Sequence, residues 1–441
     1  MDDGYDRFVK LLDQSQHFPA QRLRALQDRG LQRFLRHAYE EVPAYKQRLA
    51  PLFSAGPEPD LSRWQDIPVL TRSQAQEASE ELKAASVPEQ AGATQTQHTS
   101  GSTGTPLVHY RSKLQQTANQ AVLDRLFQWY QMDGNKSLAQ LTTDYHDRAS
   151  YPDGYAGHEW FRGQPQGDYF HLDTLKTTTM QQLKWLAQKE AAYLNTFPNN
   201  ARGLIEAAQE ANVPPPRFDV VLLSGEVLED ETRKLIADTI ADAVINLFGA
   251  SETGRLAGSC PEYGTLHIHE EISFLEVVDE QGKPVPDGET GRFVTTSFYN
   301  FAMPLIRYAL GDYGAVSASP CPCGRQGRTL KFVAGRQRNL FRFVDGTSKW
   351  PDMKLRELRM IYSFRQMQVV QDKIDHLTVY MVKSTDGSVL DHEALQEVFR
   401  RSLHPSLNIT IKLCDEIARA ASGKFEDFIS KITTESDQSL S

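Results

Sequence analysis

The chain has 441 residues, of which 40% are hydrophobic and 24% are charged, and its formal net charge is −9. That length and composition suit a folded protein of two or three domains, and the acidic balance excludes a general nucleic-acid-binding surface, which is basic. No apolar run approaches the roughly 20 residues that cross a bilayer, and the acidic N-terminus lacks an apolar signal region. No membrane contact is therefore expected, and the cytoplasm is the expected location.

The first part of the chain is predicted to be mainly helical. Apolar residues at helical spacing predict two helices within residues 5–50. Proline and turn-forming residues predict a connector over 51–72, and helical patterns return at 112–132 and 177–192.

Between these helices, residues Thr99–Pro106 read Thr-Ser-Gly-Ser-Thr-Gly-Thr-Pro and contain no core-forming side chain. Glycines let backbone N–H groups point together around an anion, and hydroxyls add donors, so the segment suits a phosphate chain. It lacks the Gly-Lys-[Ser/Thr] ending of a Walker loop, so it is a different kind of phosphate loop. A flexible linker of the same composition is the alternative. The residues expected to hold phosphates are Thr99, Ser100, Gly101, Ser102, Thr103, Gly104 and Thr105.

The stretch 133–172 combines many aromatic side chains with Gly and Asp and is expected to be irregular. Its aromatic residues include Tyr145, Tyr155, Trp160 and Phe161. Such side chains can line a ligand pocket, or they can pack beneath a long loop. The sequence leaves both interpretations open.

From residue 200 onward, helical and strand patterns alternate, which predicts a parallel sheet covered by helices. The helices are expected at 201–211 and 229–243, and the strands at 220–223 and 244–248. In such sheets ligands bind at the carboxyl ends of the strands. Two polar motifs fall at these ends, namely Ser224-Gly-Glu226 and Gly249-Ala-Ser-Glu252.

The remainder of the chain is predicted to be antiparallel β followed by a small α+β unit. Residues 272–316 alternate as antiparallel strands with turns at Gly282 and Gly288. Beyond Gly335, strand patterns at 369–370, 377–382 and 409–413 surround a helical pattern at 393–402.

Three of the four cysteines cluster in the sequence with a histidine. Cys260, His267, Cys321 and Cys323 offer thiolate and imidazole ligands, the set that a tetrahedral Zn²⁺ takes. His269 would face the same side of a strand as His267, so either could serve. Without an open coordination position, such a metal would be structural. Three buried apolar cysteines are the alternative, and Cys414 stands apart as an expected core residue.

Six motifs follow one another along the chain. They are the Thr99–Pro106 loop, Ser224-Gly-Glu226, Phe248-Gly-Ala-Ser-Glu252, Arg307-Tyr-Ala-Leu-Gly-Asp312, Gly335-Arg336 and Ser422-Gly-Lys424. In this order they resemble the adenylate-forming superfamily of acyl-CoA synthetases, peptide-synthetase adenylation domains and luciferases. Within it, the chain is similar to the phenylacetate–CoA ligase branch and its capsule-biosynthesis relatives, which carry a similar cysteine and histidine set.

The resemblance implies an α/β fold with two domains. A large N-terminal domain, residues 1–334, would bind ATP and the acid and would combine parallel sheets with a β-barrel-like subdomain. A small mobile α+β domain, residues 335–441, would carry the catalytic lysine, and a hinge near Gly335–Asn339 would close it over the site.

The resemblance also implies a role for each motif residue. Lys424 would contact the carboxylate and the α-phosphate, because a compact ammonium suits the charge that develops at phosphorus. Glu252, the second catalytic residue, would ligate Mg²⁺. Phe248 would lie against the adenine, with a core phenylalanine as the alternative; Asp312 would accept the ribose hydroxyls, and Arg336 would lie near the ribose and phosphates. The nucleotide site would further include Thr99 to Thr105, Ser224, Gly225, Glu226, Gly249, Ala250 and Ser251.

The implied reaction is ATP-dependent activation of a carboxylic acid to an acyl-AMP with release of pyrophosphate. The acyl group would then pass to a thiol such as that of CoA, or to an amine. ATP, Mg²⁺ and a structural Zn²⁺ are the implied cofactors, the aromatic stretch favours an aryl acid, and a monomer or homodimer is expected. A repurposed nucleotide-binding protein without turnover is the alternative, and a zinc-stabilised interaction protein is a third class.

Two departures from the family pattern affect these expectations. Arg338-Asn339 replaces the acidic residues that usually follow Gly-Arg at the hinge. Leu107-Val108-His109 follows the phosphate loop where the family often has a lysine. The departure at Arg338-Asn339 puts the usual hinge electrostatics in doubt, but not the hinge itself, and it motivates the repurposed alternative.

Overall fold

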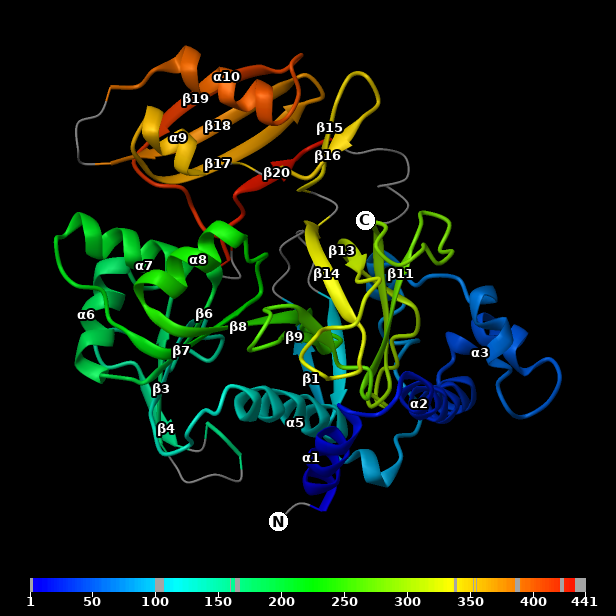
Figure 1. The fold of residues 1–441 in the computed structure, drawn as a ribbon. Coiled ribbons are helices and arrows are strands. Elements are labelled where there is room, and N and C mark those ends of the chain that lie inside the picture. Colours follow the sequence, from blue (N-terminus) through cyan, green and yellow to red (C-terminus); the bar gives the residue numbers. More distant parts are fainter. Residues whose placement is uncertain are drawn as a thin grey trace.

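The computed structural model places a smaller body above one end of a larger one (Figure 1). It describes residues 3–99, 107–158, 160–162, 167–336, 339–351, 353, 355–384, 389–420 and 424–432. The larger body holds a twelve-stranded sheet and the smaller body a four-stranded sheet. No helix in these ranges is both long enough and apolar enough to cross a membrane.

The N-terminal helices cover the larger body. The two helices expected within residues 5–50 are α1 (Asp3–Ser15) and α2 (Ala20–Glu41), and a short α3 (Tyr45–Leu49) follows them. Helix α1 packs on α5 (Lys113–Trp129), and α2 buries its apolar stripe against the antiparallel strands. The apolar spacing therefore predicted the helices correctly, because one face of each is buried.

The parallel half of the large sheet runs in the order β5-β3-β6-β7-β8. Its strands, such as Phe-Asp-Val-Val-Leu-Leu-Ser in β7, read as nearly continuous apolar runs because helices cover them. The alternation predicted after residue 200 is confirmed, although α8 ends earlier than expected because Ala241 already begins a strand. The elements are β3 (Leu138–Thr142), β5 (Asp168–Asp173), α6 (Thr179–Lys189), β6 (Tyr193–Thr196), α7 (Pro198–Glu210), β7 (Phe218–Ser224), α8 (Asp230–Thr239) and β8 (Ala241–Ala250).

The expectation of an irregular stretch at 133–172 was wrong in part, although residues 143–154 contain neither helix nor strand. It contains β3, β5 and the antiparallel edge strand β4 (Tyr155–His158). The rings of Trp160 and Phe161 lie 5.4 and 5.3 Å from the ring of Phe127 on α5 and are buried. These two aromatic residues therefore pack in a core, while Tyr145 is 69% exposed.

Strand β8 joins the two halves of the large sheet. Its residues up to Leu247 pair in parallel with β7, and its residues from Leu247 to Ala250 pair antiparallel with β9 (Gly254–Ser259). The antiparallel half continues through β10 (Leu266–Ile268), β14 (Thr329–Arg336), β13 (Tyr308–Val316), β12 (Gly291–Ser297) and β11 (Ser273–Val278). The expected β-barrel-like part is thus continuous with the parallel part, because one long strand belongs to both.

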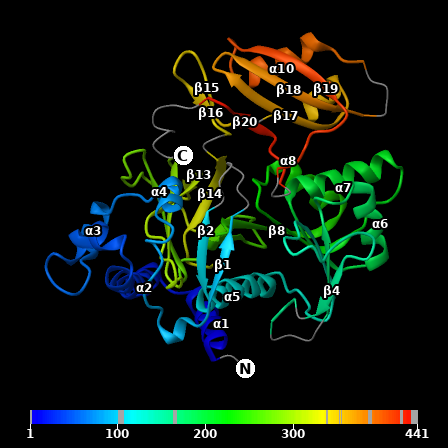
Figure 2. The same ribbon diagram turned by 180° about the vertical axis from the view of Figure 1, so that it is seen from behind.

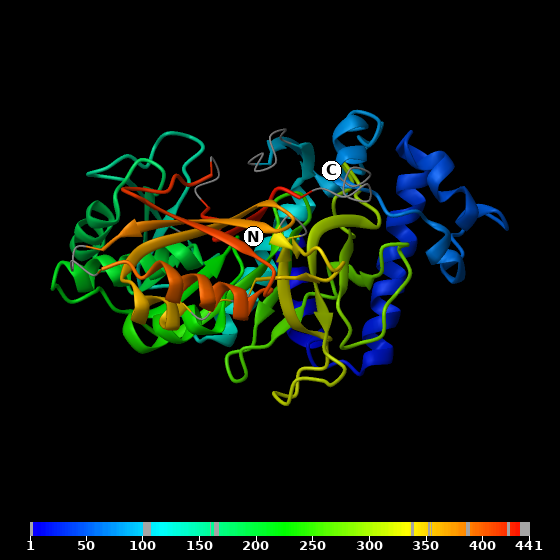
Figure 3. The same ribbon diagram turned by 90° about the horizontal axis from the view of Figure 1, so that it is seen from above.

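The smaller body is the expected α+β unit. Its sheet runs β19-β18-β17-β20, and α9 and α10 supply apolar residues to its core. Figure 2 shows it above α7 and α8 and near the end of β14, and Figure 3, the view from above, shows it lying over the green part of the larger body. Its elements are α9 (Leu355–Ile361), β17 (Phe364–Lys373), β18 (His376–Lys383), α10 (His392–Ser402), β19 (Asn408–Cys414) and β20 (Phe428–Ser430).

Shorter elements connect these parts. A hairpin of β1 (Thr94–His98) and β2 (Val108–Ser112) flanks the predicted phosphate loop, and α4 (Arg72–Glu77) precedes it. A second hairpin, β15 (Phe341–Arg342) and β16 (Ser348–Lys349), leads into the smaller body. The single-turn helices are η1 (Ala50–Phe53), η2 (Leu61–Asp66) and η3 (Glu89–Ala91).

Candidate active site

The carboxyl ends of β7 and β8 meet beside the smaller body, and the sequence motifs lie there. Ser224 ends β7, and Gly225 and Glu226 follow it. Phe248, Gly249 and Ala250 end β8, with Ser251 and Glu252 in the following turn. Parallel strands bring these ends to one edge, as the alternation of elements predicted.

Glu252 is buried at this edge, where it is only 5% exposed. Its Oε1 accepts hydrogen bonds from Arg72 Nη1 at 3.1 Å and from the hydroxyl of Tyr308 at 2.9 Å. Burial, and then the charge of Glu252, raise the pKa of Tyr308 well above its usual value. The tyrosine therefore stays neutral and donates to the carboxylate.

Arg72 also connects Glu252 to the predicted phosphate loop. Its Nη2 donates to Thr99 Oγ1 at 2.7 Å, and the backbone N–H of Leu107 donates to the same oxygen at 2.8 Å. Residues Ser100 to Pro106 lie outside the described residues, so the phosphate contacts expected of Ser100, Gly101, Ser102, Thr103, Gly104 and Thr105 stay predictions. The two ends of the loop are nevertheless held together, and Arg72 connects them to Glu252.

Asp312 and Arg336 lie opposite each other on β13 and β14. The distance from Arg336 Nε to Asp312 Oδ1 is 3.9 Å. Arg336 ends the last strand of the large sheet, so it lies where the chain leaves for the smaller body. The motif order had not predicted that these two residues would be neighbours in a sheet.

Lys424 reaches this site from the smaller body. A Cβ added to Gly225 would lie 2.9 Å from Lys424 Cε and 3.2 Å from Lys424 Nζ, so the lysine packs directly on the glycine. Burial and then the charge of Arg336 lower the pKa of Lys424, while three carboxylates oppose that shift. Those carboxylates belong to Glu226, Asp312 and Glu252. Residues from four distant motifs thus surround one ammonium group.

Both carboxylate oxygens of Glu226 accept hydrogen bonds from backbone N–H groups. Its Oε2 accepts from the N–H of Asn199 at 2.9 Å, and its Oε1 accepts from the N–H of Phe425 at 2.8 Å. Burial raises the pKa of Glu226 to about 7, although both N–H donors favour the charged form. The carboxylate therefore links the large body to the residue next to Lys424.

Phe248 and Gly249 have packing roles in the structure. The Phe248 ring lies 5.4 Å from the ring of Phe293, in the apolar cluster of the antiparallel strands. A Cβ at Gly249 would lie 2.3 Å from the carbonyl oxygen of Gly254, so the close approach of β8 and β9 requires glycine. Contact of Phe248 with adenine and of Gly249, Ala250 and Ser251 with a nucleotide stays a prediction.

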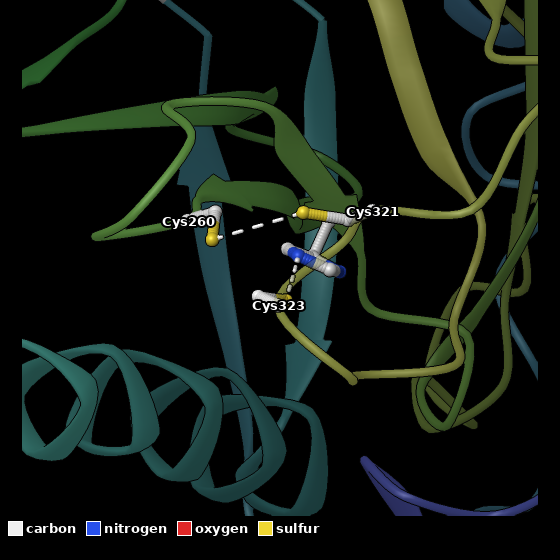
Figure 4. A group of neighbouring side chains, drawn as sticks. Cys260, Cys321 and Cys323 are labelled. Carbon is white, nitrogen blue, oxygen red and sulfur yellow. Dashed lines mark hydrogen bonds between the residues drawn. The ribbon is translucent and has the colours of Figure 1, made fainter.

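The predicted zinc ligands form a second cluster, in which Figure 4 labels Cys260, Cys321 and Cys323. One ligand atom from each of Cys260, His267, Cys321 and Cys323 lies within 4.8 Å of the others. Cys321 Sγ is 3.9 Å from Cys260 Sγ, and Cys323 Sγ is 3.4 Å from His267 Nε2. His269 Nδ1 instead lies 2.9 Å from Arg125 Nη2, so His267 is the histidine of the cluster and His269 is not.

The surroundings of the cluster favour a neutral imidazole at His267 and a protonated thiol at Cys260. Burial, and then Arg325, lower the pKa of His267 to about 4. Burial raises the pKa of the Cys260 thiol to about 11. Cys414 lies in β19, where its Sγ is 3.5 Å from the carbonyl oxygen of Met381.

Sequence reasoning missed the partners that organise this site. Arg72 and Tyr308 hold Glu252, and Asn199 and Asp427 join α7 to the Lys424 segment. Tyr308 lies inside a quoted motif but had no assigned role. Nothing in the sequence around Arg72 or Asn199 distinguishes them from surface residues.

Comparison with known proteins gives a consistent result. A family model described as the CapK C-terminal domain matches residues 358–431. Phenylacetate-coenzyme A ligase of Thermus thermophilus is 25% identical over 350 residues, which cover 76% of this chain and 74% of that protein. Phenylacetate-coenzyme A ligase of Escherichia coli K12 is 23% identical over 430 residues, which cover 90% of this chain and 92% of that protein.

Solved structures share the fold of this chain. A 2-hydroxyisobutyryl-CoA ligase in the postadenylation state matches with a TM-score of 0.73 and 17% identity, over 96% of this chain and 92% of that chain. An open conformation of the same ligase matches with a TM-score of 0.60 and 17% identity, over 95% of this chain and 93% of that chain.

Replacing Gly225 by alanine should displace Lys424. The new Cβ would meet Lys424, and φ at this position is +85°, which strains an L side chain. That strain should raise the undocked fraction of the segment 424–432 by roughly tenfold. Native-state cleavage by trypsin after Lys424, detected by mass spectrometry, measures this fraction.

Gly203→Ala in α7 is the matched control, because a Cβ there meets no atom within 4 Å. Cleavage after Lys424 should be no faster in this variant than in the wild type. Equal cleavage of wild type and Gly225→Ala would contradict the close packing of Lys424.

Proposed function

Because the chain is a phenylacetate–CoA ligase-like member of the adenylate-forming superfamily, we propose that it activates a carboxylic acid with ATP and passes the acyl group to CoA. In the first step a carboxylate oxygen attacks the α-phosphorus, and the bond to the leaving pyrophosphate breaks. In the second step the CoA thiol loses its proton and attacks the acyl carbon, and AMP leaves. An amine acceptor in place of the thiol is the second candidate, as the sequence allowed.

The observation that carries this proposal is the position of Lys424. Its ammonium lies with Glu226, Asp312, Glu252 and Arg336, although it comes from the other body. A compact cation placed there would stabilise negative charge that develops on the carboxylate and the α-phosphate. A nucleotide-binding protein without turnover would not need this lysine at the site.

The large body would hold the nucleotide. We propose that Thr99 and the following loop hold the β- and γ-phosphates, that Asp312 accepts the ribose hydroxyls and that Arg336 lies near them. The ends of the loop and Glu252 are already joined through Arg72. Domains 1–334 and 335–441, with a hinge near Gly335, would let the lysine enter and leave.

Mg²⁺ fits the residues at the phosphate end of this site. Mg²⁺ is usually bound by one or two carboxylates together with substrate phosphates. Glu252 would hold it, since its carboxylate is buried and fixed by Arg72 and Tyr308. When bound, the ion would neutralise charge on the phosphates.

A structural Zn²⁺ fits the cysteine and histidine cluster. Bond lengths of about 2.3 Å to sulfur and about 2.0 Å to nitrogen give tetrahedral edges of about 3.8 Å between sulfurs and about 3.5 Å between sulfur and nitrogen. The separations of 3.9 Å between Cys321 and Cys260 and of 3.4 Å between Cys323 and His267 match these edges. A cation would also compensate the buried thiolates, whereas uncharged buried cysteines need no such spacing.

The acid is proposed to be small, and an aryl acid such as phenylacetate is the first candidate because two relatives are phenylacetate-coenzyme A ligases. Trp160 and Phe161 do not support it, since they pack in a core. A cytoplasmic location would suit the use of ATP and CoA and keep the cysteines reduced.

Lys424→Ala should slow formation of the acyl adenylate by about 100-fold or more, because a preorganised cation at the developing charge is removed. The measurement is single-turnover release of pyrophosphate from ATP in the presence of phenylacetate or of another carboxylic acid that the wild-type protein activates. Lys431→Ala is the control, since its side chain is exposed on the same small body. Full activity of Lys424→Ala would contradict the assigned role.

Removal of zinc should destabilise the folded chain. Purified protein should contain about one zinc per chain, and Cys321→Ser should lose it and lower Tm by about 5–10 °C. Cys414→Ser, which changes a cysteine outside the cluster, should keep the metal. Folded wild-type protein that contains no metal would contradict the zinc site.

A further inference from the structure

Two carboxylates join the smaller body to the N-terminal turn of α7. We propose that Glu226 and Asp427 form a latch that holds the Lys424 segment on the large body and so selects the conformer that forms the acyl adenylate. The latch rests on the proposed function. It makes Glu226 a positioning residue, which acts through Lys424.

On the large body, the latch lies at the N-terminus of α7, where the N-cap residue supplies no capping side chain. Phe197, the N-cap residue of α7, offers no side-chain hydrogen bond to the first turn. The first N–H groups of a helix lack partners within the helix, so they need an acceptor from elsewhere. Glu226 supplies one, since its Oε2 accepts from the N–H of Asn199 at 2.9 Å. A carboxylate at a helix N-terminus is also favoured by the helix dipole.

The second oxygen of Glu226 binds the smaller body. Its Oε1 accepts from the N–H of Phe425 at 2.8 Å, and Phe425 follows Lys424 directly. One carboxylate therefore satisfies a donor of α7 and a donor of the lysine segment. Without it, both N–H groups would need other partners at a closed interface.

Asp427 makes the reciprocal contact from the smaller body. Its Oδ2 accepts from Asn199 Nδ2 at 2.8 Å, and its Oδ1 accepts from Arg202 Nη2 at 3.0 Å. The carbonyl oxygen of Asp427 accepts from the N–H of Val369 in β17 at 2.8 Å. The first turns of α7 are thus connected through Asp427 to the small sheet itself.

These bonds fix the lysine because they hold the residues that directly follow it in the chain. Lys424 packs on Gly225, and Glu226, the next residue, holds Phe425. Rotation of the smaller body away from α7 would break the bonds of both carboxylates and withdraw the ammonium at the same time. Acyl transfer, which does not use Lys424 in the proposed reaction, would not require these bonds.

The test compares the two half-reactions in Glu226→Ala and Asp427→Ala. Phenylacetate is the probe acid. If the wild-type protein activates another carboxylic acid faster, that acid replaces it. Each variant should form acyl adenylate about 10- to 100-fold more slowly, because charged hydrogen bonds at a buried interface are lost. Transfer from added acyl adenylate to CoA should change less than about threefold. Glu210→Ala, at an exposed end of α7, should leave both rates unchanged.

Hydrogen exchange of the full chain without ligands tests the latch independently of activity. The Phe425 amide, in a peptide from residues 424–432, should lose about tenfold or more of its protection in both variants and none in Glu210→Ala. Unchanged protection, or an equal fall of the two half-reactions, would overturn the latch. If wild-type protein activates no acid, the proposed function fails, and this exchange still decides whether the latch exists.

Discussion

The docking of one short segment, residues 424–427, on the first turns of α7 is the contact on which the candidate site depends. Lys424 belongs to the smaller body, which has its own four-stranded sheet, so it can face Glu252, Asp312 and Arg336 only while that segment is docked. The contact includes hydrogen bonds and an ion pair between Asp427 and Arg202, and α9 adds an ion pair between Arg359 and Glu206 of α7. Interfaces of this kind hold a geometry firmly yet can be broken as a unit.

The long strand β8 provides the fixed half of the site. Because β8 pairs with β7 on one side and with β9 on the other, its end lies at the junction of the parallel and antiparallel halves. Glycine at position 249 permits the close approach of β9. The turn that follows places Glu252 within hydrogen-bond distance of Arg72 and Tyr308. A strand end on one side and a lysine from a separate body on the other suit the proposed reaction, in which one charged group would enter and leave.

Much of this could be predicted from the sequence. Periodicity predicted α1, α2 and the alternation around β7 and β8, because these elements bury regular apolar patterns. The cysteines and His267 were chosen by ligand chemistry, and the structure brings them together. The strands within 133–172 were missed because β4 and β5 mix polar and aromatic residues at the edge of the sheet.

The rest depends on contacts between distant residues. Arg72 and Glu252 are 180 positions apart, and no local pattern marks an arginine that will be needed there. The choice of His267 over His269 follows from Arg125, which only the folded chain brings near. Glu226 likewise makes its two hydrogen bonds, one to α7 and one to Phe425, only once the two bodies meet.

Exchange of labelled pyrophosphate into ATP by the wild-type protein, over a panel of carboxylic acids that includes phenylacetate, tests acid activation most directly. Exchange requires the acid to cleave and reform the bond between the α- and β-phosphates, which a nucleotide-binding protein without turnover cannot do. We expect exchange that depends on Mg²⁺ and on one chemical class of acid. No exchange with any acid of the panel, in protein that is folded and binds ATP, would contradict acid activation.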